Sequence, residues 1–260
     1  MTTSLRIAAV QHDIVWTDRD ANFERLAPMV AGAAAAGAGL VLLAETFSTG
    51  FAVDQPGWGE EEDGPSASFL QEQARHHGVW VGGTCPEVIP DAPPDDRRPS
   101  NTFVLAGPDG TTHRYRKIHP FGYGGEHEHV RAGTELVTVD VEGLRVSLFV
   151  CYDLRFADDM WQLAPTTDVY LVPANWPTPR RLHWQALLQA RAIENQAYVV
   201  GVNRVGEGGR LHYSGDSRVV DPQGELLATA AVGETILLAD VSADEVAATR
   251  ERFPFLPDRR

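Results

Sequence analysis

The sequence predicts an α/β protein whose β-sheets are mixed rather than purely parallel. Short apolar runs typical of buried strands alternate with amphipathic helix patterns along most of the 260 residues. Turn sequences of the hairpin type, such as Gly107–Gly110 and Glu142-Gly143, separate other strands, and hairpins join antiparallel neighbours. No segment is repeated, so we expect a single domain over residues 1–260.

The first third of the chain alternates strands with helices. Residues 40–44 are a continuous apolar run, which is typical of a strand covered on both faces. Asp20 is placed to cap the helix before this run, and Gly78 is placed to end the helix after it. The expected elements are strands over 5–11, 40–44 and 79–84, a helix from Asp20 to about Gly37 or Gly39, and a helix over 66–77.

The rest of the chain mixes hairpins with further strand–helix units. Residues 86–100 are rich in proline and charge, and we interpret them as a solvated loop because strand patterns resume directly after them. We expect a long helix over 181–196, whose apolar residues are Leu182, Ala186, Leu187, Ala190 and Ile193. The other expected elements are strands over 102–106, 111–117, 136–141, 144–150, 169–172, 198–202, 217–220 and 235–241, and helices over 155–163 and from Ser242 to about Pro254.

The composition excludes several classes of function. The chain has 22 basic and 36 acidic residues and a formal net charge of −14, so phosphate backbones repel it and we expect no nucleic-acid partner. Cys85 and Cys151 are too few for a disulfide framework and fit a reducing compartment. Because we find neither a signal peptide nor a membrane span, we expect a soluble, cytoplasmic protein without a membrane partner.

Three residues of types used in hydrolysis stand at the ends of predicted strands. Cys151 lies on the turn from a strand into a helix, where free backbone N–H groups hold an oxyanion and favour a thiolate. Glu45 ends the apolar run 40–44, and Lys117 ends the strand over 111–117. Each also has an ordinary explanation, namely a buried structural cysteine, a charge emerging into solvent, and a solvated cationic face.

The sequence around these residues forms three motifs. In chain order they are Leu43-Ala-Glu-Thr-Phe-Ser-Thr-Gly-Phe51, Tyr115-Arg-Lys-Ile-His-Pro-Phe121 and Phe149-Val-Cys-Tyr-Asp-Leu-Arg155, and they are followed by Pro173–Pro177, Arg191–Tyr198 and Gly201–Val205. These motifs resemble the catalytic motifs of the nitrilase superfamily of carbon–nitrogen hydrolases. The resemblance covers residue 5 to about residue 240.

The resemblance implies a role for each of the three residues. Cys151 is then the nucleophile. Glu45 is the general base, which takes the thiol proton and later activates water. Lys117 lies beside the developing oxyanion, and the backbone N–H of Tyr152 helps it. The product of the first step is a thioester, formed as ammonia leaves.

The family also has a second glutamate after the lysine motif. Glu126 and Glu128 are both available, and we prefer Glu126 because its distance to Ala132-Gly133 fits the family pattern better. With His119, His127 and His129, these glutamates look like a metal cluster, but the spacing matches no common metal motif. The resemblance implies no metal and no cofactor, so we interpret this segment as a polar loop at the mouth of the site.

Several other residues are candidates for substrate binding. Trp176 lies in a turn-rich loop after a strand, a position that often lines sites in α/β proteins. Phe51 and Tyr123 are further candidates for the pocket wall. Arg155 is a candidate for binding a substrate carboxylate, although pairing with a nearby aspartate, at position 153 or 158, is the simpler explanation.

The fold that the resemblance implies is a four-layer α-β-β-α sandwich, in which two mixed sheets lie face to face with helices outside. Members of the family commonly pair through their outer helices. The tail over about 250–260 contains the apolar segment Phe253–Pro257, which is suited to docking on a partner. We therefore expect a homodimer.

Within the superfamily, Glu45–Phe51 and the stretch from Asn175 to Asp216 look most like bacterial ω-amidases, which act on the terminal amide of small 2-oxo acids such as 2-oxoglutaramate. Ala44 departs from the proline that is usual in that group. An amidase or carbamoylase acting on another small metabolite, or a nitrilase, remains an alternative. A non-catalytic binding protein is disfavoured because the three catalytic residue types are all intact.

Overall fold

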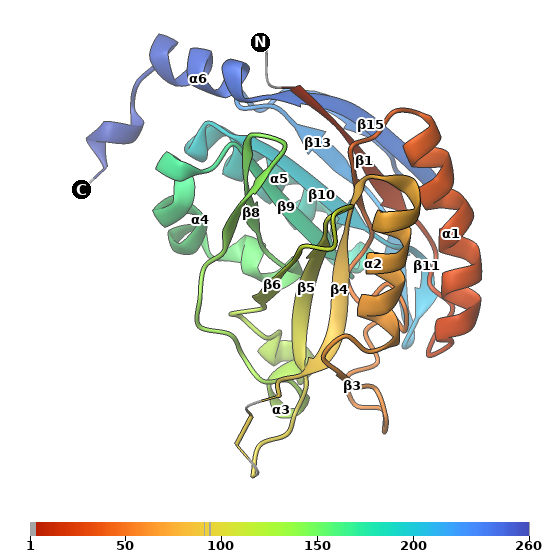
Figure 1. Ribbon diagram of the computed structural model, residues 1–260. Coiled ribbons are helices and arrows are strands. Elements are labelled where there is room, and N and C mark those ends of the chain that lie inside the picture. The colour runs from red at the N-terminus through yellow and green to blue at the C-terminus, as the bar shows by residue number, and fades with distance from the viewer. Residues whose placement is uncertain (1–3, 91, 94, 260) are drawn as a thin grey trace.

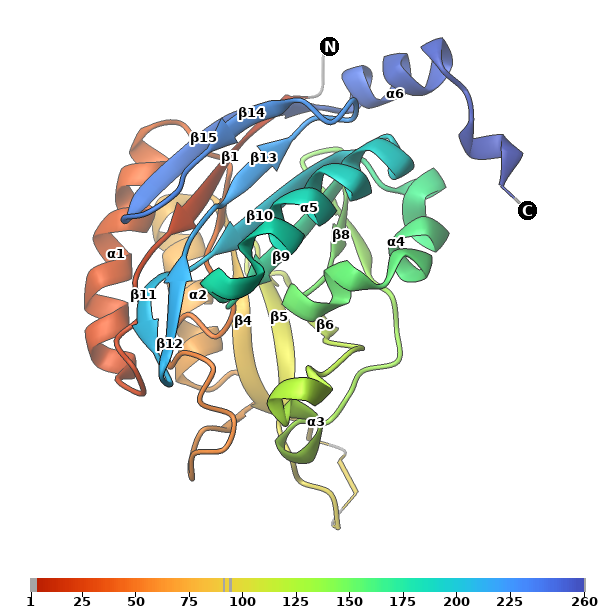
Figure 2. The same cartoon turned by 180° about the vertical axis from the view of Figure 1, so that it is seen from behind.

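The computed structural model describes residues 4–90, 92–93 and 95–259. Two mixed β-sheets lie face to face, and helices cover their outer sides (Figures 1 and 2). The expected four-layer α-β-β-α sandwich is confirmed. Among the described residues, no helix is both long enough and apolar enough to cross a membrane.

The first sheet has parallel strands at its centre and antiparallel strands on both sides. β2 pairs in parallel with β1 and β4, while β15 and β5 add antiparallel partners. Its strands, in spatial order, are β15 (Thr235–Ser242), β1 (Ser4–Gln11), β2 (Leu40–Leu42), β4 (Trp80–Val88), β5 (Ser100–Ala106) and β6 (Thr112–Arg116), with β3 (Glu60–Glu61) beside β4.

The second sheet follows the same plan. β9 pairs in parallel with β8 and β10, and antiparallel strands flank them. Its order is β14 (Leu226–Thr229), β13 (Arg218–Val220), β10 (Tyr198–Asn203), β9 (Val169–Ala174), β8 (Leu144–Leu148) and β7 (Thr138–Val141). A separate hairpin, β11 (Val205–Gly208) and β12 (Leu211–Ser214), was not predicted, and neither was β14.

The helices cover the two outer faces and one end. α1 (Arg19–Ala35) and α2 (Pro65–His77) lie on the first sheet, and α5 (Arg181–Asn195) lies on the second beside α4 (Ala157–Leu163). α6 (Ala243–Arg252) extends from the edge of the sandwich (Figure 1). The short α3 (Glu126–His129) lies below the sheets.

The alternation of side chains along β1 explains how one strand serves two layers. Ile7 and Ala9 belong to the core between the sheets, while Ala8 and Val10 belong to the core under α1 and α2. Both faces are therefore apolar, as a strand covered on both sides requires.

Two predictions about helices were wrong. The cap of α1 is Asp18, whose side chain accepts a hydrogen bond from the N–H of Ala21, and Asp20 lies inside the first turn. The predicted helix over 155–163 is divided into a 3₁₀ turn over Cys151–Arg155 and then α4. The predicted loop over 86–100 starts later, because β4 continues to Val88; positions 91 and 94 of this loop lie outside the described residues.

α5 does not bury all of the apolar residues that mark this helix in the sequence. Trp184 and Leu188 are buried, whereas Leu182 is 70% and Ile193 is 49% exposed. The reason lies in β10: a Cβ atom placed on Gly201 would lie 2.5 Å from Leu188 Cδ1. Gly201 leaves space for Trp184 and Leu188, which therefore form the buried side of α5. The apolar character of the helix residues alone does not reveal this space.

Candidate active site

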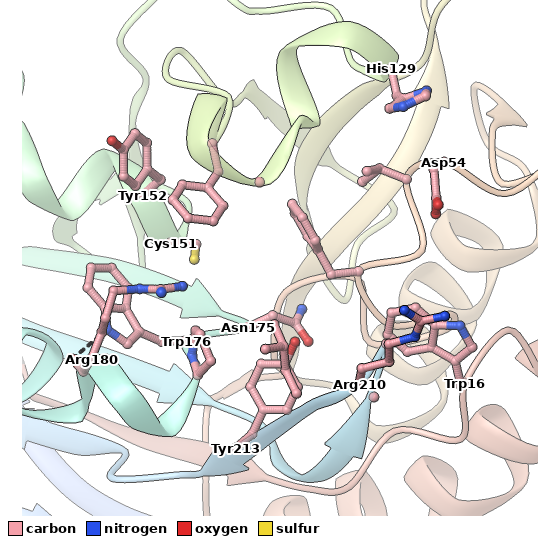
Figure 3. A pocket seen from close by; sticks show the side chains of 18 of the residues that line it. Trp16, Asp54, His129, Cys151, Tyr152, Asn175, Trp176, Arg180, Arg210 and Tyr213 are labelled. Carbon is pink, nitrogen blue, oxygen red and sulfur yellow. Dashed lines mark hydrogen bonds between the residues drawn. The ribbon is translucent and has the colours of Figure 1, made fainter.

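The site lies where strands of the two sheets end. Glu45 follows β2, Lys117 follows β6, Cys151 follows β8, and Asn175 follows β9. Cys151 and Asn175 face a cavity of about 640 Å³ (Figure 3), which Lys117 also lines. Ligand sites of α/β proteins commonly lie at the carboxyl ends of parallel strands, and β2, β8 and β9 all have parallel partners.

Three fully buried charged residues form one cluster. Lys117 Nζ lies 2.9 Å from Glu45 Oε1 and 2.9 Å from Glu126 Oε2. Burial by itself would lower the pKa of Lys117, but the carboxylates of Glu126 and Glu45 outweigh it and raise that pKa well above its ordinary value. Lys117 is therefore an ammonium ion held between two carboxylates.

Asn101, which lies on β5, forms hydrogen bonds with both carboxylates. Its Nδ2 donates to Glu45 Oε1 at 2.9 Å and to Glu126 Oε1 at 3.1 Å. The backbone N–H of Phe121 also donates to Glu126. Glu128, the alternative second glutamate, is exposed and takes no part in these hydrogen bonds. The geometry thus puts Glu126 in the cluster.

Cys151 is 9% exposed and has an unusual backbone. Its φ angle is 46°, in the left-handed region that L-residues seldom adopt. Burial raises the pKa of its thiol well above the ordinary value, and Glu45 adds to this, while Lys117 acts in the opposite direction. The resting sulfur is a thiol, so it needs a base before it can attack a substrate.

Asp153 holds the turn that carries Cys151. Its carboxylate accepts hydrogen bonds from the N–H of Val150 at 2.9 Å, the hydroxyl of Tyr115 at 2.8 Å and the N–H of His119 at 2.9 Å. Burial raises the pKa of Asp153 to about 6. These bonds link the segment after β6 to the turn after β8, and so link the backbones next to Lys117 and Cys151.

Asn175 was missed by the sequence reasoning. Its backbone N–H donates to Glu45 Oε2 at 2.7 Å, and its side-chain amide donates to the Glu45 carbonyl at 2.6 Å and to Thr46 Oγ1 at 2.9 Å. Together with Asn101 it fixes the Glu45 carboxylate. The available signal was its place in the loop shortly after the predicted strand 169–172, next to Trp176.

Four of the predicted binding residues line the cavity, and one does not. Phe51, Tyr152, Arg155 and Trp176 are in its wall. Tyr123 is 89% exposed and lies outside this wall, so the expectation for it was wrong. The neighbouring Phe121 lines the cavity instead, because residues 122–124 form a tight 3₁₀ turn that carries position 123 outward.

Arg155 pairs with no aspartate among the residues that the structure describes. Its guanidinium lies over the ring of Trp176, with the carbon Cζ 4.6 Å from the ring centroid, and contacts His183 Nδ1 at 3.3 Å. Asp153 is occupied by the hydrogen bonds of its own turn. Arg180, Arg210 and Tyr213, which the sequence reasoning did not select, also line the cavity.

The histidines of the predicted polar loop are dispersed. His119 contacts Asp159 at 2.7 Å, and His129 lines the cavity. In the part of the chain that the structure describes, no three histidine, cysteine or acidic side chains are grouped so that they could hold a metal ion. Cys85 is a free, buried thiol inside β4.

A Glu–Lys–Cys site at the strand ends of a double-sheet sandwich defines a class of hydrolases, and the chain belongs to it. Residues 6–251 match the family model of carbon–nitrogen hydrolases. Among characterised relatives, "Omega-amidase YafV" of Escherichia coli (strain K12) is 39% identical over 257 residues, which cover 98% of this chain and 96% of the relative. The "2-oxoglutaramate amidase" of Bacillus subtilis (strain 168) is 34% identical over 86% of this chain and 85% of its own.

Solved structures agree with this assignment. XC1258 from Xanthomonas campestris, described as a CN-hydrolase superfamily protein with an arsenic adduct in the active site, superposes with a TM-score of 0.92 at 34% identity. The match covers 99% of this chain and 97% of that protein. The chain is therefore a carbon–nitrogen hydrolase in sequence and in fold.

Proposed function

We propose that this protein is an ω-amidase, which hydrolyses the terminal amide of a small 2-oxo acid such as 2-oxoglutaramate and releases ammonia. The observation that carries the proposal is the buried Glu45–Lys117–Glu126 cluster beside Cys151 in one cavity. Two relatives, matched over most of the chain, are named for this activity.

In the proposed reaction Cys151 is the nucleophile and Glu45 is the base. Glu45 removes the thiol proton as the sulfur attacks the amide carbon. The carbonyl oxygen becomes an oxyanion, which the ammonium of Lys117 and the N–H of Tyr152 stabilise. Glu45 then returns the proton to the leaving nitrogen, so ammonia departs and a thioester remains.

The second half of the reaction uses the same carboxylate. Glu45 removes a proton from water, the hydroxide attacks the thioester, and the thiol leaves with that proton. The products are the free acid and the resting thiol. Glu126 keeps Lys117 protonated and in place throughout, because its two oxygens lie 3.1 and 2.9 Å from the ammonium.

The substrate lies against Phe51, Tyr152 and Trp176, and Arg155 binds its carboxylate. A charged hydrogen bond to a guanidinium suits this task because its planar donors match a carboxylate. The cavity of about 640 Å³ exceeds the size of a five-carbon amide. This favours an amidase or carbamoylase for another small metabolite as the second candidate.

The rest of the molecule fits a dimer that acts in a reducing compartment. Leu182 and Ile193 on α5 are exposed, and so is Phe253, which is 67% exposed in the tail after α6. We propose that these apolar side chains contact a second copy, that the chain works as one catalytic domain, and that it acts in the cytoplasm, where the Cys151 thiol stays reduced. The molar mass in solution tests the dimer.

The test of the activity is ammonia release from a panel of 2-oxo acid amides, simple amides, carbamoyl amino acids and nitriles. We expect the highest kcat/KM with a 2-oxo acid ω-amide. A preference for a carbamoyl compound or a nitrile would contradict the ω-amidase assignment and leave the hydrolase family intact.

A further inference from the structure

The cavity wall next to Cys151 contains two guanidinium groups that have no carboxylate partner among the described residues. Arg155 and Arg180 both line the cavity, and neither forms an ion pair there. In Figure 3, Arg180 lies on the same side of the cavity as Cys151, whereas Arg210 lies on the opposite side.

Aromatic rings hold both guanidinium groups in place. Arg155 Cζ lies 4.6 Å from the centroid of the Trp176 ring and 5.8 Å from that of Tyr152. Arg180 Cζ lies 5.3 Å from the centroid of Phe121. Stacking of this kind positions an arginine and leaves its N–H donors free for another acceptor.

The rings that hold the two arginines also contact each other or the backbone of Arg180. The Phe121 and Tyr152 ring centroids are 4.9 Å apart, and the Trp176 indole N–H donates to the backbone carbonyl of Arg180 at 2.8 Å. We call these five residues the arginine frame. Tyr152 directly follows Cys151, so the frame begins at the nucleophile.

The arginine frame has two positive charges and no negative partner among the described residues. The two like charges repel each other, and the neighbouring Arg180 contributes, after burial, to lowering the pKa of Arg155. Lys117 contacts two carboxylates and serves the oxyanion, so it is not the partner of a substrate carboxylate. The chain as a whole has a net charge of −14, so an anionic substrate needs local cations to bind here.

We infer that Arg155 and Arg180 together bind the carboxylate of the substrate, and that Arg180 sets the preference of the enzyme for anionic amides. The inference rests on the proposed function and specifies its substrate class: short amides that carry a carboxylate a few bonds from the scissile carbon. The carboxylate lies between the two guanidinium groups and removes their repulsion.

Arg155 makes one further side-chain hydrogen bond, to His183 Nδ1 at 3.3 Å, so Arg180 is the cleaner residue for the test. Arg180 interacts with its surroundings through the face of Phe121 and through its backbone carbonyl, and the carbonyl survives any substitution. The variants Arg180→Gln and Arg155→Gln are therefore expected to fold. Arg180→Lys keeps the charge but loses the planar fork, and Arg210→Gln removes a cation at the other side of the cavity.

The experiment measures kcat and KM for two substrates with the same acyl chain, a 2-oxo acid ω-amide and its carboxyl methyl ester, which lacks the negative charge. The ratio of the two kcat/KM values is the charge preference. We expect Arg180→Gln to lower kcat/KM for the acid by roughly 10- to 100-fold, mainly through KM, and for the ester by less than about threefold. Arg180→Lys recovers part of the preference, and Arg210→Gln leaves the ratio close to that of the wild type.

Two results would overturn the inference, and they differ in what else they affect. If the wild type prefers the acid and Arg180→Gln keeps that preference, Arg180 does not read the carboxylate, and the ω-amidase assignment stands. If the wild type shows no preference for the acid over the ester, both the inference and the 2-oxo acid assignment fail.

Discussion

At the scale of single residues, the site is organised around a shortage of positive charge. Glu45 and Glu126 share one ammonium, that of Lys117. Amide groups of Asn101 and Asn175 and the backbone N–H of Phe121 supply further donors. When both carboxylates are ionised the cluster has a net charge of −1. A proton taken from Cys151 removes this negative charge. The buried cluster is therefore suited to accept that proton.

Glu126→Gln tests this balance. The side-chain NH₂ of glutamine would face the donors of Lys117 and Phe121, and Lys117 would lose a carboxylate that raises its pKa. We expect kcat/KM for the preferred amide to fall by roughly 100-fold or more, with the fold retained. Glu128→Gln, two residues away and exposed, is the control and should change activity by less than about twofold. Equal effects of the two changes would refute the role given to Glu126.

At the scale of elements, hydrogen bonds connect the segments that follow neighbouring strands. His12, directly after β1, lies between the N–H of Ala44, which approaches its Nε2 at 3.4 Å, and the carbonyl of Asp13, 3.0 Å from its Nδ1. This arrangement suits the neutral ring with its hydrogen on Nδ1. Burial lowers the pKa of His12 to about 4. The connection supports the backbone just before Glu45.

The low pKa of His12 predicts a loss of stability in acid. Between about pH 6.5 and pH 4 the unfolded chain binds a proton at this histidine and the folded chain does not, so the stabilisation present above pH 6.5 is lost as the pH falls. Relative to His12→Gln, the free energy of unfolding of the wild type should decrease by about 3 kcal/mol across this window. Urea unfolding at pH 7 and pH 4.5 measures it, and parallel curves for the two proteins would disprove the prediction.

The contact between α5 and β10 gives a second prediction at this scale. A Cβ atom on Gly201 would lie 2.5 Å from Leu188 Cδ1 and 2.9 Å from Trp184 Cζ2. Gly201→Ala should therefore lower the free energy of unfolding by about 1–3 kcal/mol through overpacking. Gly32→Ala in α1 is the matched control: its Cβ meets no atom within 4 Å, and it should stabilise the helix by about 0.5–1 kcal/mol. Thermal unfolding of both variants measures these changes. A Gly201→Ala protein as stable as the wild type would contradict the packing described for α5 and β10.

At the scale of the whole molecule, the order of strands and helices was predictable from the sequence because each element has its own periodicity and turn signals. The arrangement of two sheets face to face was not. It entered through the family resemblance, since no periodicity says which sheet a strand joins. The strands β11 and β12 were missed because their short segments, with glycine or polar residues, look like loops, and β14 was missed because it is only four residues long and lies mostly exposed.

The residues of the site also fall into those that the sequence predicted and those that only the fold reveals. Glu45, Lys117 and Cys151 each follow a predicted strand, but that position alone also has an ordinary explanation, and the resemblance of the surrounding motifs to the family assigned their roles. Asn101 and Asn175 act through residues of other strands, so their role depends on distances that only the fold creates. The same holds for Arg180, whose guanidinium acquires its place from an aromatic ring 59 positions earlier in the chain, Phe121.

The covalent state of the enzyme during turnover shows most directly whether Cys151 is the nucleophile. The protein is mixed with its preferred amide, quenched with acid within one turnover, and digested for peptide mass analysis. We expect the mass of the acyl group on the peptide that contains Cys151, and neither adduct nor ammonia with Cys151→Ala. Ammonia release by Cys151→Ala at the wild-type rate, or an adduct on Cys85 instead, would contradict this role of Cys151.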